Sequence, residues 1–196
     1  LFTVASTDPR QASAMDLGFK IGPRINAAGR LADMSIGIRC LLSDDFAAAL
    51  ELAQELDQWN HSRRSIEQNM SEQAMVALDS DDFPLKHSIC IFNADWHQGV
   101  VGIVASRLKE KFWKPTLAFA PGDNGEIRGS GRSVPDVHLR DALDLVSKRH
   151  PHLIAKFGGH AMAAGLTIAE ADFETFIYAF DKAVVDISGK TEFAPI

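Results

Sequence analysis

Three short segments of this 196-residue sequence combine glycine with arginine, serine or histidine, and such side chains suit phosphate binding. The first is Arg128-Gly-Ser-Gly-Arg-Ser133. Arginine can hold a phosphate with two parallel hydrogen bonds, and serine adds a hydroxyl donor. On a strand, Arg128, Ser130 and Arg132 would share one face, and the glycines would let phosphate oxygens approach the backbone. The alternative is an edge strand weakened by glycine, with solvated arginines.

The second segment, Phe157-Gly-Gly-His-Ala-Met-Ala-Ala-Gly165, has two glycines before a histidine and only small residues after it. This spacing indicates a tight backbone pressed against another group, with His160 able to donate a hydrogen bond to a phosphate. A lone histidine more often has no special role, but the flanking glycines favour a functional one.

The third segment, residues 93–102, ends an expected strand, turns at a glycine and begins an expected helix. Unpaired N–H groups and a partial positive charge at a helix N-terminus attract anions. Alternatively, His97 caps the helix and Trp96 fills a gap in the core. A further segment, Gly22-Pro-Arg-Ile-Asn-Ala-Ala-Gly-Arg30, predicts a loop whose glycines and asparagine bring the backbone close to a ligand, with an ordinary surface turn as the alternative.

Patterns for metal binding and nucleophilic catalysis are missing from the sequence. The seven histidines form neither an HExxH pattern nor a visible pairing with clustered carboxylates. Cys40 and Cys90 form no CxxC pair, which excludes a zinc knuckle and indicates two reduced thiols of a cytosolic protein. The sequence thus contains candidate phosphate-binding residues, but metal ligands and a general base are not evident in it. This combination looks like half of an active site.

The composition limits the partners of the chain. A net charge of −6 argues against a protein that coats DNA by bulk electrostatics, although it leaves room for a local phosphate site. The longest apolar run, residues 99–105, is far shorter than the ~20 residues that span a bilayer. No secretory signal opens the sequence. We therefore expect a cytoplasmic protein without a membrane partner.

Hydrophobic spacing predicts the elements that position these segments. Residues 1–33 are loop-rich, and Ser43-Asp-Asp begins a helix that meets no glycine or proline before Pro84, a rod of roughly 50 Å. Strands and helices then alternate, which predicts an α/β fold: a mixed sheet flanked by helices and preceded by a long connector helix. The expected strands are residues 88–93, 116–120, 125–132 and 162–168, and the expected helices are residues 35–42, 99–112, 138–148 and 170–186.

Four segments in this order resemble the carboxy-terminal half of the RecJ-type exonucleases, the single-strand-specific DNA exonucleases of the DHH phosphoesterase superfamily. They are residues 22–30, 96–107, 129–133 and 158–165. The resemblance covers essentially the whole chain and implies three parts. These are residues 1–42 as the tail of the catalytic DHH domain, residues 43–80 as the connector, and residues 81–196 as a DHHA1-type substrate-binding domain.

The resemblance implies metal-assisted hydrolysis of single-stranded DNA from 5′ to 3′, in DNA repair and recombination. Family members bind Mn²⁺ or Mg²⁺ in a lobe that carries an Asp-His-His triplet, and the active site lies in the cleft facing it. That triplet is absent here, so no residue is assigned to a metal, and the chain alone is expected to be inactive. Single-stranded DNA is the implied partner, and a single-strand DNA-binding protein is a further candidate. With few phosphate contacts, binding should be weak and steeply salt-dependent.

The same resemblance assigns roles to individual residues. It implies that Arg132 and His160 lie nearest the reacting phosphate, with Ser130 and the amides of Gly158 and Gly159 beside them. The other expected substrate-binding residues are Arg24, Asn26, Arg30, His97, Gln98, Arg107, Arg128 and Ser133.

Two other interpretations share these motifs. One is a superfamily member that cleaves short oligonucleotides or small nucleotides. The other is a nucleic-acid-binding module without chemistry, like the related domain of alanyl-transfer-RNA synthetases. The Asn-Ala-Ala-Gly-Arg segment and the long connector favour the exonuclease over both.

Overall fold

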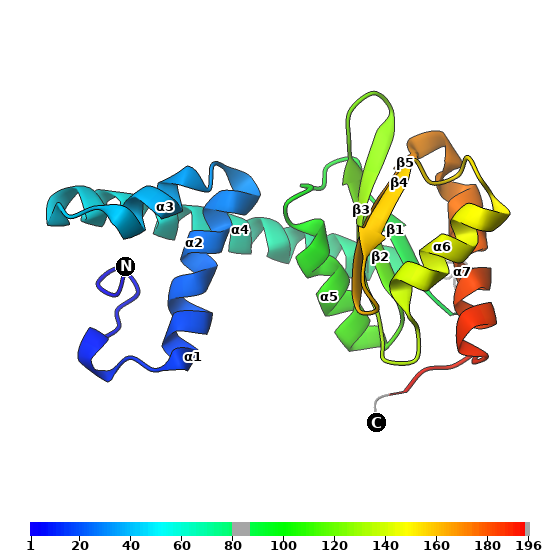
Figure 1. Cartoon of the computed structure of the whole chain (residues 1–196), viewed down its shortest axis with the longest axis horizontal. Coiled ribbons are helices and arrows are strands. Elements are labelled where there is room, and N and C mark those ends of the chain that lie inside the picture. The colour runs from blue at the N-terminus through cyan, green and yellow to red at the C-terminus, as the bar shows by residue number, and fades with distance from the viewer. Residues whose placement is uncertain (80–86, 195–196) are drawn as a thin grey trace. The chain divides into compact units, whose positions relative to one another are not determined.

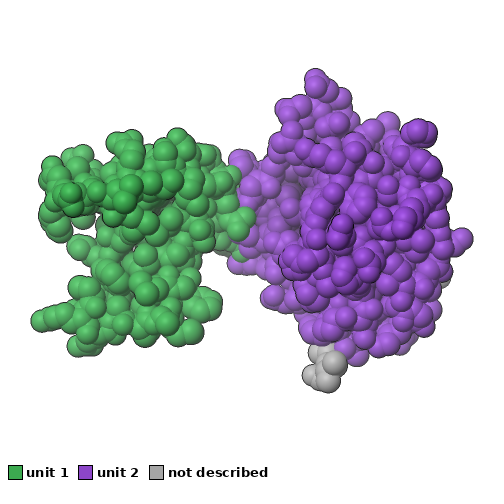
Figure 2. Space-filling model, in the orientation of Figure 1, with its two compact units in different colours: residues 1–68 green, residues 69–196 purple. Residues whose placement is uncertain are grey.

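The computed structural model describes residues 1–79 and 87–194, and the chain divides into two compact units, residues 1–68 and 69–196 (Figure 2). The boundary expected between residues 80 and 81 lies outside the described residues.

The first unit is helical. Its elements are a 3₁₀ turn at Pro9–Gln11, α1 (Ala14–Asp16), a π-helical turn at Leu17–Ile21, α2 (Gly22–Leu31), α3 (Ser35–Leu42) and the first part of α4 (Phe46–Leu78). Buried Ala28, Cys40, Ala53 and Leu56 join α2, α3 and α4 in a small core.

The prediction of a ligand-binding loop at residues 22–30 is wrong, because these residues form helix α2. Proline is tolerated in the first turn of a helix, and the residues after Pro23 include strong helix formers. Gly29 has an ordinary helical backbone, and a Cβ there would lie 3.1 Å from the Cε of Met34. This glycine therefore lets the start of α3 pack closely against α2.

Helix α4 has 33 residues, and at ~1.5 Å per residue it is about 50 Å long, as predicted. Asp45 rather than Ser43 caps its start, since Asp45 Oδ1 accepts the N–H of Ala47 at 2.8 Å. Ala53 and Leu56 of this helix are fully buried in the core of the first unit.

The second unit contains the predicted mixed sheet (Figure 1). Its strands lie in the order β1-β2-β3-β5-β4, with β1 and β2 parallel and the other pairs antiparallel. The strands are β1 (Ile89–Phe92), β2 (Thr116–Pro121), β3 (Glu126–Arg132), β4 (Lys156–Gly159) and β5 (Ala163–Ala169), and the helices are α5 (Val101–Phe112), α6 (Leu139–Arg149) and α7 (Phe173–Ser188). Every strand and helix predicted after residue 87 is present within a few residues of its expected bounds. Strand β4 is an addition that the sequence pattern does not predict.

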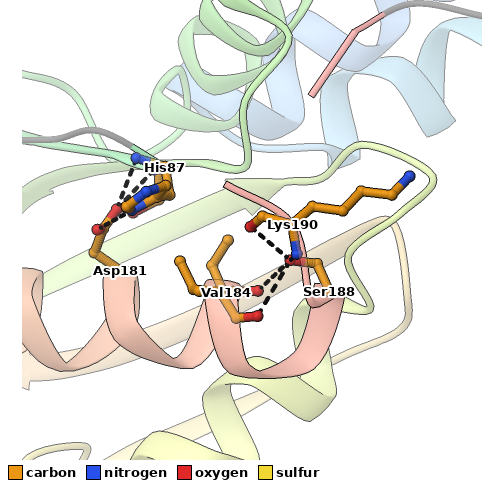
Figure 3. A network of polar contacts seen from close by, with 7 residues as sticks. His87, Asp181, Val184, Ser188 and Lys190 are labelled. Carbon is orange, nitrogen blue, oxygen red and sulfur yellow. Dashed lines mark hydrogen bonds and ion pairs between the residues drawn. The ribbon is translucent and has the colours of Figure 1, made fainter. Parts of the chain in front are cut away.

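Helices α6 and α7 cover one face of the sheet and form its main core. Fully buried Phe119, Phe176 and Phe180 pack edge-to-face or stacked in this layer. Asp181 of α7 accepts hydrogen bonds from Ser88 and from His87, which fastens α7 to the beginning of β1 (Figure 3).

Helix α5 lies against β2 and β3 on the opposite face (Figure 1). Trp96, just before α5, is 4% exposed, and its Nε1 donates to Gln73 Oε1 of α4 at 2.8 Å. In the part of the chain that the structure describes, no helix has both the length and the apolar character needed to cross a membrane.

Candidate phosphate-binding site

Strand β3 presents its polar side chains on the face that α5 partly covers. Ile127 is fully buried in the core on the other face, and a Cβ at Gly129 or Gly131 would lie 2.5 Å from the Phe119 or Leu117 side chain. The idea that these two glycines admit phosphate oxygens is therefore wrong, because they make room for core side chains instead. Arg128, Ser130 and Arg132 share the opposite face, as the alternation of a strand predicts.

Arg132 and His160 lie in one row across this face. Arg132 pairs with Ala163 of β5, and the N–H of His160 donates to the carbonyl of Ala163 at 2.8 Å. Neighbouring strands are ~4.8 Å apart, so about 10 Å separates the Cα atoms of Arg132 and His160. His160 directly follows β4, and its Nδ1 accepts the N–H of Met162 at 3.3 Å, which leaves Nε2 as the ring nitrogen that could donate to a phosphate near Arg132.

The guanidinium of Arg132 also lies over the first turn of α5. A Cβ at Gly102 would be 3.2 Å from Arg132 Nη2 and 3.6 Å from Ser130 Oγ. Arg132 Nη1 donates to the carbonyl of Gly131 at 2.7 Å. A cation and the positive end of a helix repel each other, whereas an anion is attracted by both. This arrangement therefore favours an anion beside Gly102, Ser130 and Arg132.

In the loop before α5, the hydrogen bonds of His97 are made to residues of the loop itself and of the start of the helix. His97 Nδ1 accepts the N–H of Gly99 at 3.0 Å, and the carbonyl of His97 accepts the N–H groups of Val100 and Val101. His97 therefore orders the turn before α5, but its side chain does not cap the helix as the alternative expected, since Val100 is the N-cap and no side chain caps it. With Nδ1 accepting, the proton of the neutral ring is on Nε2.

Gln98 and Arg128 form a polar chain at the side of the site. Gln98 Nε2 donates to the carbonyl of Pro121 at 2.9 Å, and its Oε1 accepts from Arg128 Nη1 at 3.0 Å. Arg128 Nη2 also forms an ion pair with Asp123 at 2.8 Å. The charge of Arg128 is therefore partly neutralised, unlike a free arginine.

The glycines of β4 shape the turn that carries His160. Gly159 has a φ of +150°, and a Cβ there would lie 2.3 Å from the carbonyl of Ala163, so only glycine fits. This confirms the tight backbone that the sequence predicted. Gly158 has nothing within 4 Å of its Cβ position, so its outer face is open.

Two residues of the second unit that the sequence grouped with this site lie apart from it. Ser133 is 1% exposed, and its hydroxyl donates to the carbonyl of Val137 at 2.7 Å. Arg107 is exposed on α5, five residues after Gly102, which turns it about 140° away around the helix.

The remaining candidates belong to the first unit. Arg24 forms an ion pair with Asp57 of α4 at 2.8 Å and donates to the carbonyl of Lys20, with its side chain only 13% exposed. Asn26 and Arg30 are exposed on α2. Arg24 therefore joins two helices.

Sequence reasoning missed the role of Gly102. The signal was a glycine in the first turn of an otherwise β-branched helix, Val100-Val-Gly-Ile-Val104, where alanine would favour the helix more.

Within residues 1–79 and 87–194, no three His, Cys, Asp or Glu side chains come together in a way that could hold a metal ion. In these two ranges the structure thus contains no ready-made set of three such ligands for Mn²⁺ or Mg²⁺.

The chain is similar to several known proteins. The family model described as "DHHA1 domain" matches residues 85–186. The chain is 47% identical over 189 residues to the "Single-stranded-DNA-specific exonuclease RecJ" of Salmonella typhimurium, covering 95% of this chain and 33% of that protein. It thus spans about a third of the length of this relative.

Two crystal structures of RecJ from Thermus thermophilus share the fold. The complex with Mn²⁺ has a TM-score of 0.81 at 31% identity and covers 95% of this chain and 26% of that one. The complex with Mg²⁺ has a TM-score of 0.83 at 30% identity and covers 99% of this chain and 29% of that one.

Proposed function

The chain belongs to the DHHA1 domain family, and from this premise we propose that it is the substrate-binding part of a RecJ-type exonuclease specific for single-stranded DNA. Its task is to hold the phosphates of one DNA strand opposite a metal centre made by other residues. The observation that carries this proposal is the row formed by Arg132 and His160 beside the N-terminal turn of α5.

Binding in this site is electrostatic and directional. Arg132 grips phosphate oxygens with two N–H groups, and Ser130 adds a hydroxyl donor from the same face of β3. His160 donates from the other end of the row, and the amides of Gly158 and Gly159 lie beside it. Held at several points, the phosphodiester is oriented for attack, which replaces a random encounter by a fixed geometry.

The relatives with Mn²⁺ and Mg²⁺ indicate where the hydrolytic chemistry comes from. In this proposal the metal ligands come from residues outside this chain, and the chain contributes binding and positioning. We accordingly expect no hydrolysis of DNA by the 196-residue chain alone, with or without Mn²⁺.

Secondary contacts complete the proposal. Gln98 and Arg128 support the loop before α5, and His97 Nε2 is a weaker donor to the same strand.

An affinity comparison tests the proposal. Fluorescence anisotropy at low salt would measure binding of the chain to a 5′-phosphorylated oligothymidylate, to a duplex and to a dinucleotide. We expect the single strand to bind best, and Arg132→Gln and His160→Gln to weaken it about tenfold each, as loss of a charge-assisted or well-placed hydrogen bond predicts. Arg140→Gln, an exposed arginine on α6, is the control with the same charge change.

The two other interpretations give different results in the same assay. Preference for the dinucleotide would favour a phosphodiesterase of small nucleotides. Equal binding of single-stranded DNA and structured RNA ends would favour a module without chemistry.

The biological setting follows from the proposed substrate. It comprises DNA repair and recombination in the cytoplasm, with a single-strand DNA-binding protein as the further partner. Two buried, unpaired thiols at Cys40 and Cys90 are compatible with a reducing compartment.

A further inference from the structure

A groove of about 380 Å³ lies on the same sheet face as the phosphate site, over β3, β5 and β4. Arg128 and Lys156 line two of its sides, and Thr167, Gly158 and Gly165 lie between them. A volume of this size falls in the range of small-ligand sites.

The register of the sheet relates this groove to Arg132 and His160. Arg128, Thr167 and Lys156 form one row across β3, β5 and β4. The row of Arg132 and His160 lies four residues further along β3 and β4 than this row. At ~3.3 Å per residue, about 13 Å therefore separates the two rows.

The row between them consists of Ser130, Gly165 and Gly158. No atom lies within 4 Å of a Cβ at Gly158, and only the carbonyl of Gly129, at 3.8 Å, approaches one at Gly165. This row therefore leaves an open floor with no side chain on β5 or β4. The second phosphate of a strand and the sugars on either side of it can lie there, between a first and a third phosphate bound at the outer rows.

The charge in the groove comes mainly from Lys156. Arg128 shares its charge with Asp123, as described above. Lys156 is exposed, and among the described residues no carboxylate forms an ion pair with it. An exposed ammonium at one side of a polar groove suits a phosphate oxygen, to which lysine binds as a point charge.

We propose that this groove is a distal nucleotide subsite, in which Lys156 and Thr167 hold the third phosphate of a strand whose first phosphate lies between Arg132 and His160. The subsite sets the length of single strand that the chain recognises. This inference rests on the proposed function, because it takes the row of Arg132 and His160 as the first phosphate position. It adds two residues, Lys156 and Thr167, that motif reasoning did not select.

A length series tests the subsite. NMR titrations would measure the affinity of the chain for 5′-phosphorylated thymidylates of one, two, three and four nucleotides. We expect affinity to rise at the third nucleotide. Lys156→Gln should leave binding of the first two lengths within twofold of the unchanged chain and weaken the longer two by five- to tenfold. For the Lys156→Gln chain and the tetranucleotide, the slope of log affinity against log salt concentration should become shallower by about 0.7. This is the change expected for one lost phosphate contact to a single strand.

Lys182→Gln is the matched control, since it removes the same charge from an exposed lysine on α7, which covers the other sheet face. Equal weakening of all lengths by Lys156→Gln, or the same length-dependent loss with Lys182→Gln, would overturn the subsite. So would an affinity that does not rise at the third nucleotide.

The two proposals fail differently in this experiment. If Arg132→Gln leaves binding of the mononucleotide unchanged, the first phosphate position is wrong and the proposed function fails with it. If Arg132→Gln weakens all lengths while Lys156→Gln changes none, only the distal subsite is wrong.

Discussion

Replacing Gly102 by alanine separates binding from folding at the proposed phosphate site. The added Cβ would lie 3.2 Å from Arg132 Nη2 and 3.5 Å from Ser130 Cβ. Favourable contacts of this kind need about 3.5–4.0 Å, so the guanidinium has to shift by a few tenths of an ångström to about 0.8 Å. Because the contacted atom is the far end of a flexible side chain, the fold can accommodate the methyl group.

Gly102→Ala is expected to preserve or increase the stability of the fold but to weaken the binding of DNA. Alanine is up to ~1 kcal/mol more favourable than glycine in a helix, so the free energy of unfolding should stay the same or rise by up to that amount. Hydrogen bonds to charged groups contribute ~1.5–3 kcal/mol, and losing about half of one such contact to phosphate costs ~1 kcal/mol of binding. That corresponds to about fivefold weaker binding of single-stranded DNA.

Urea denaturation and fluorescence anisotropy on the same preparations would measure both quantities. Gly18→Ala is the control, because Gly18 also lies in a helical segment and has nothing within 4 Å of its Cβ position. It should raise stability without changing DNA affinity. The reasoning is refuted if Gly102→Ala binds single-stranded DNA as tightly as the unchanged chain, or if it unfolds more readily by over ~1 kcal/mol, the size of the helix-propensity gain.

Three further outcomes follow from the geometry. Ser133→Ala removes a buried hydrogen bond to Val137, so urea denaturation should show a loss of ~1–2 kcal/mol, while DNA affinity measured by anisotropy stays the same; a parallel fall in affinity would return Ser133 to the site. Gly159→Ala forces a side chain into the backbone at Ala163, so the melting temperature measured by circular dichroism should fall by several degrees; an unchanged value would show that the hairpin relaxes freely. Burial, and secondarily the charge of Asp181, raises the pKa of the Cys90 thiol. An alkylating reagent should therefore modify Cys90 only after the chain unfolds, as measured by mass spectrometry. Rapid labelling of Cys90 in the native chain would contradict this.

The second unit could be predicted from local patterns because they agree with the tertiary structure. The alternation in β3 correctly assigns Arg128, Ser130 and Arg132 to one face, since a strand has a strict period of two. The same pattern could not reveal why glycines separate these residues. The reason lies in Phe119 and Leu117, which are distant in sequence and fill the space on the core side.

Two errors have a common cause. The sequence predicts a loop at residues 22–30 and no strand at β4, because glycine usually interrupts regular structure and occurs in both places. In α2, Gly29 instead allows close packing against Met34, and in β4, pairing with β5 stabilises a strand of low intrinsic propensity. In both places the secondary structure depends on tertiary contacts, which cannot be read from a single sequence.

Some site residues could not be sorted by motif alone. Arg24 and Ser133 have the residue types expected for phosphate contacts, yet one pairs with Asp57 and the other bonds to Val137. Lys156 lies outside every glycine-rich motif and reaches the substrate face only through the register of β4 with β5.

The central claim is that one face of the sheet binds the phosphates of a single DNA strand. Chemical-shift mapping of the ¹⁵N-labelled chain with a 5′-phosphorylated tetrathymidylate tests this claim most directly. We predict that the largest shifts occur in residues 99–102, 130–132 and 156–160, and that they decrease steeply as salt is added. Shifts confined to α6, α7 or the β1 edge, or no shifts at millimolar oligonucleotide, would contradict the account.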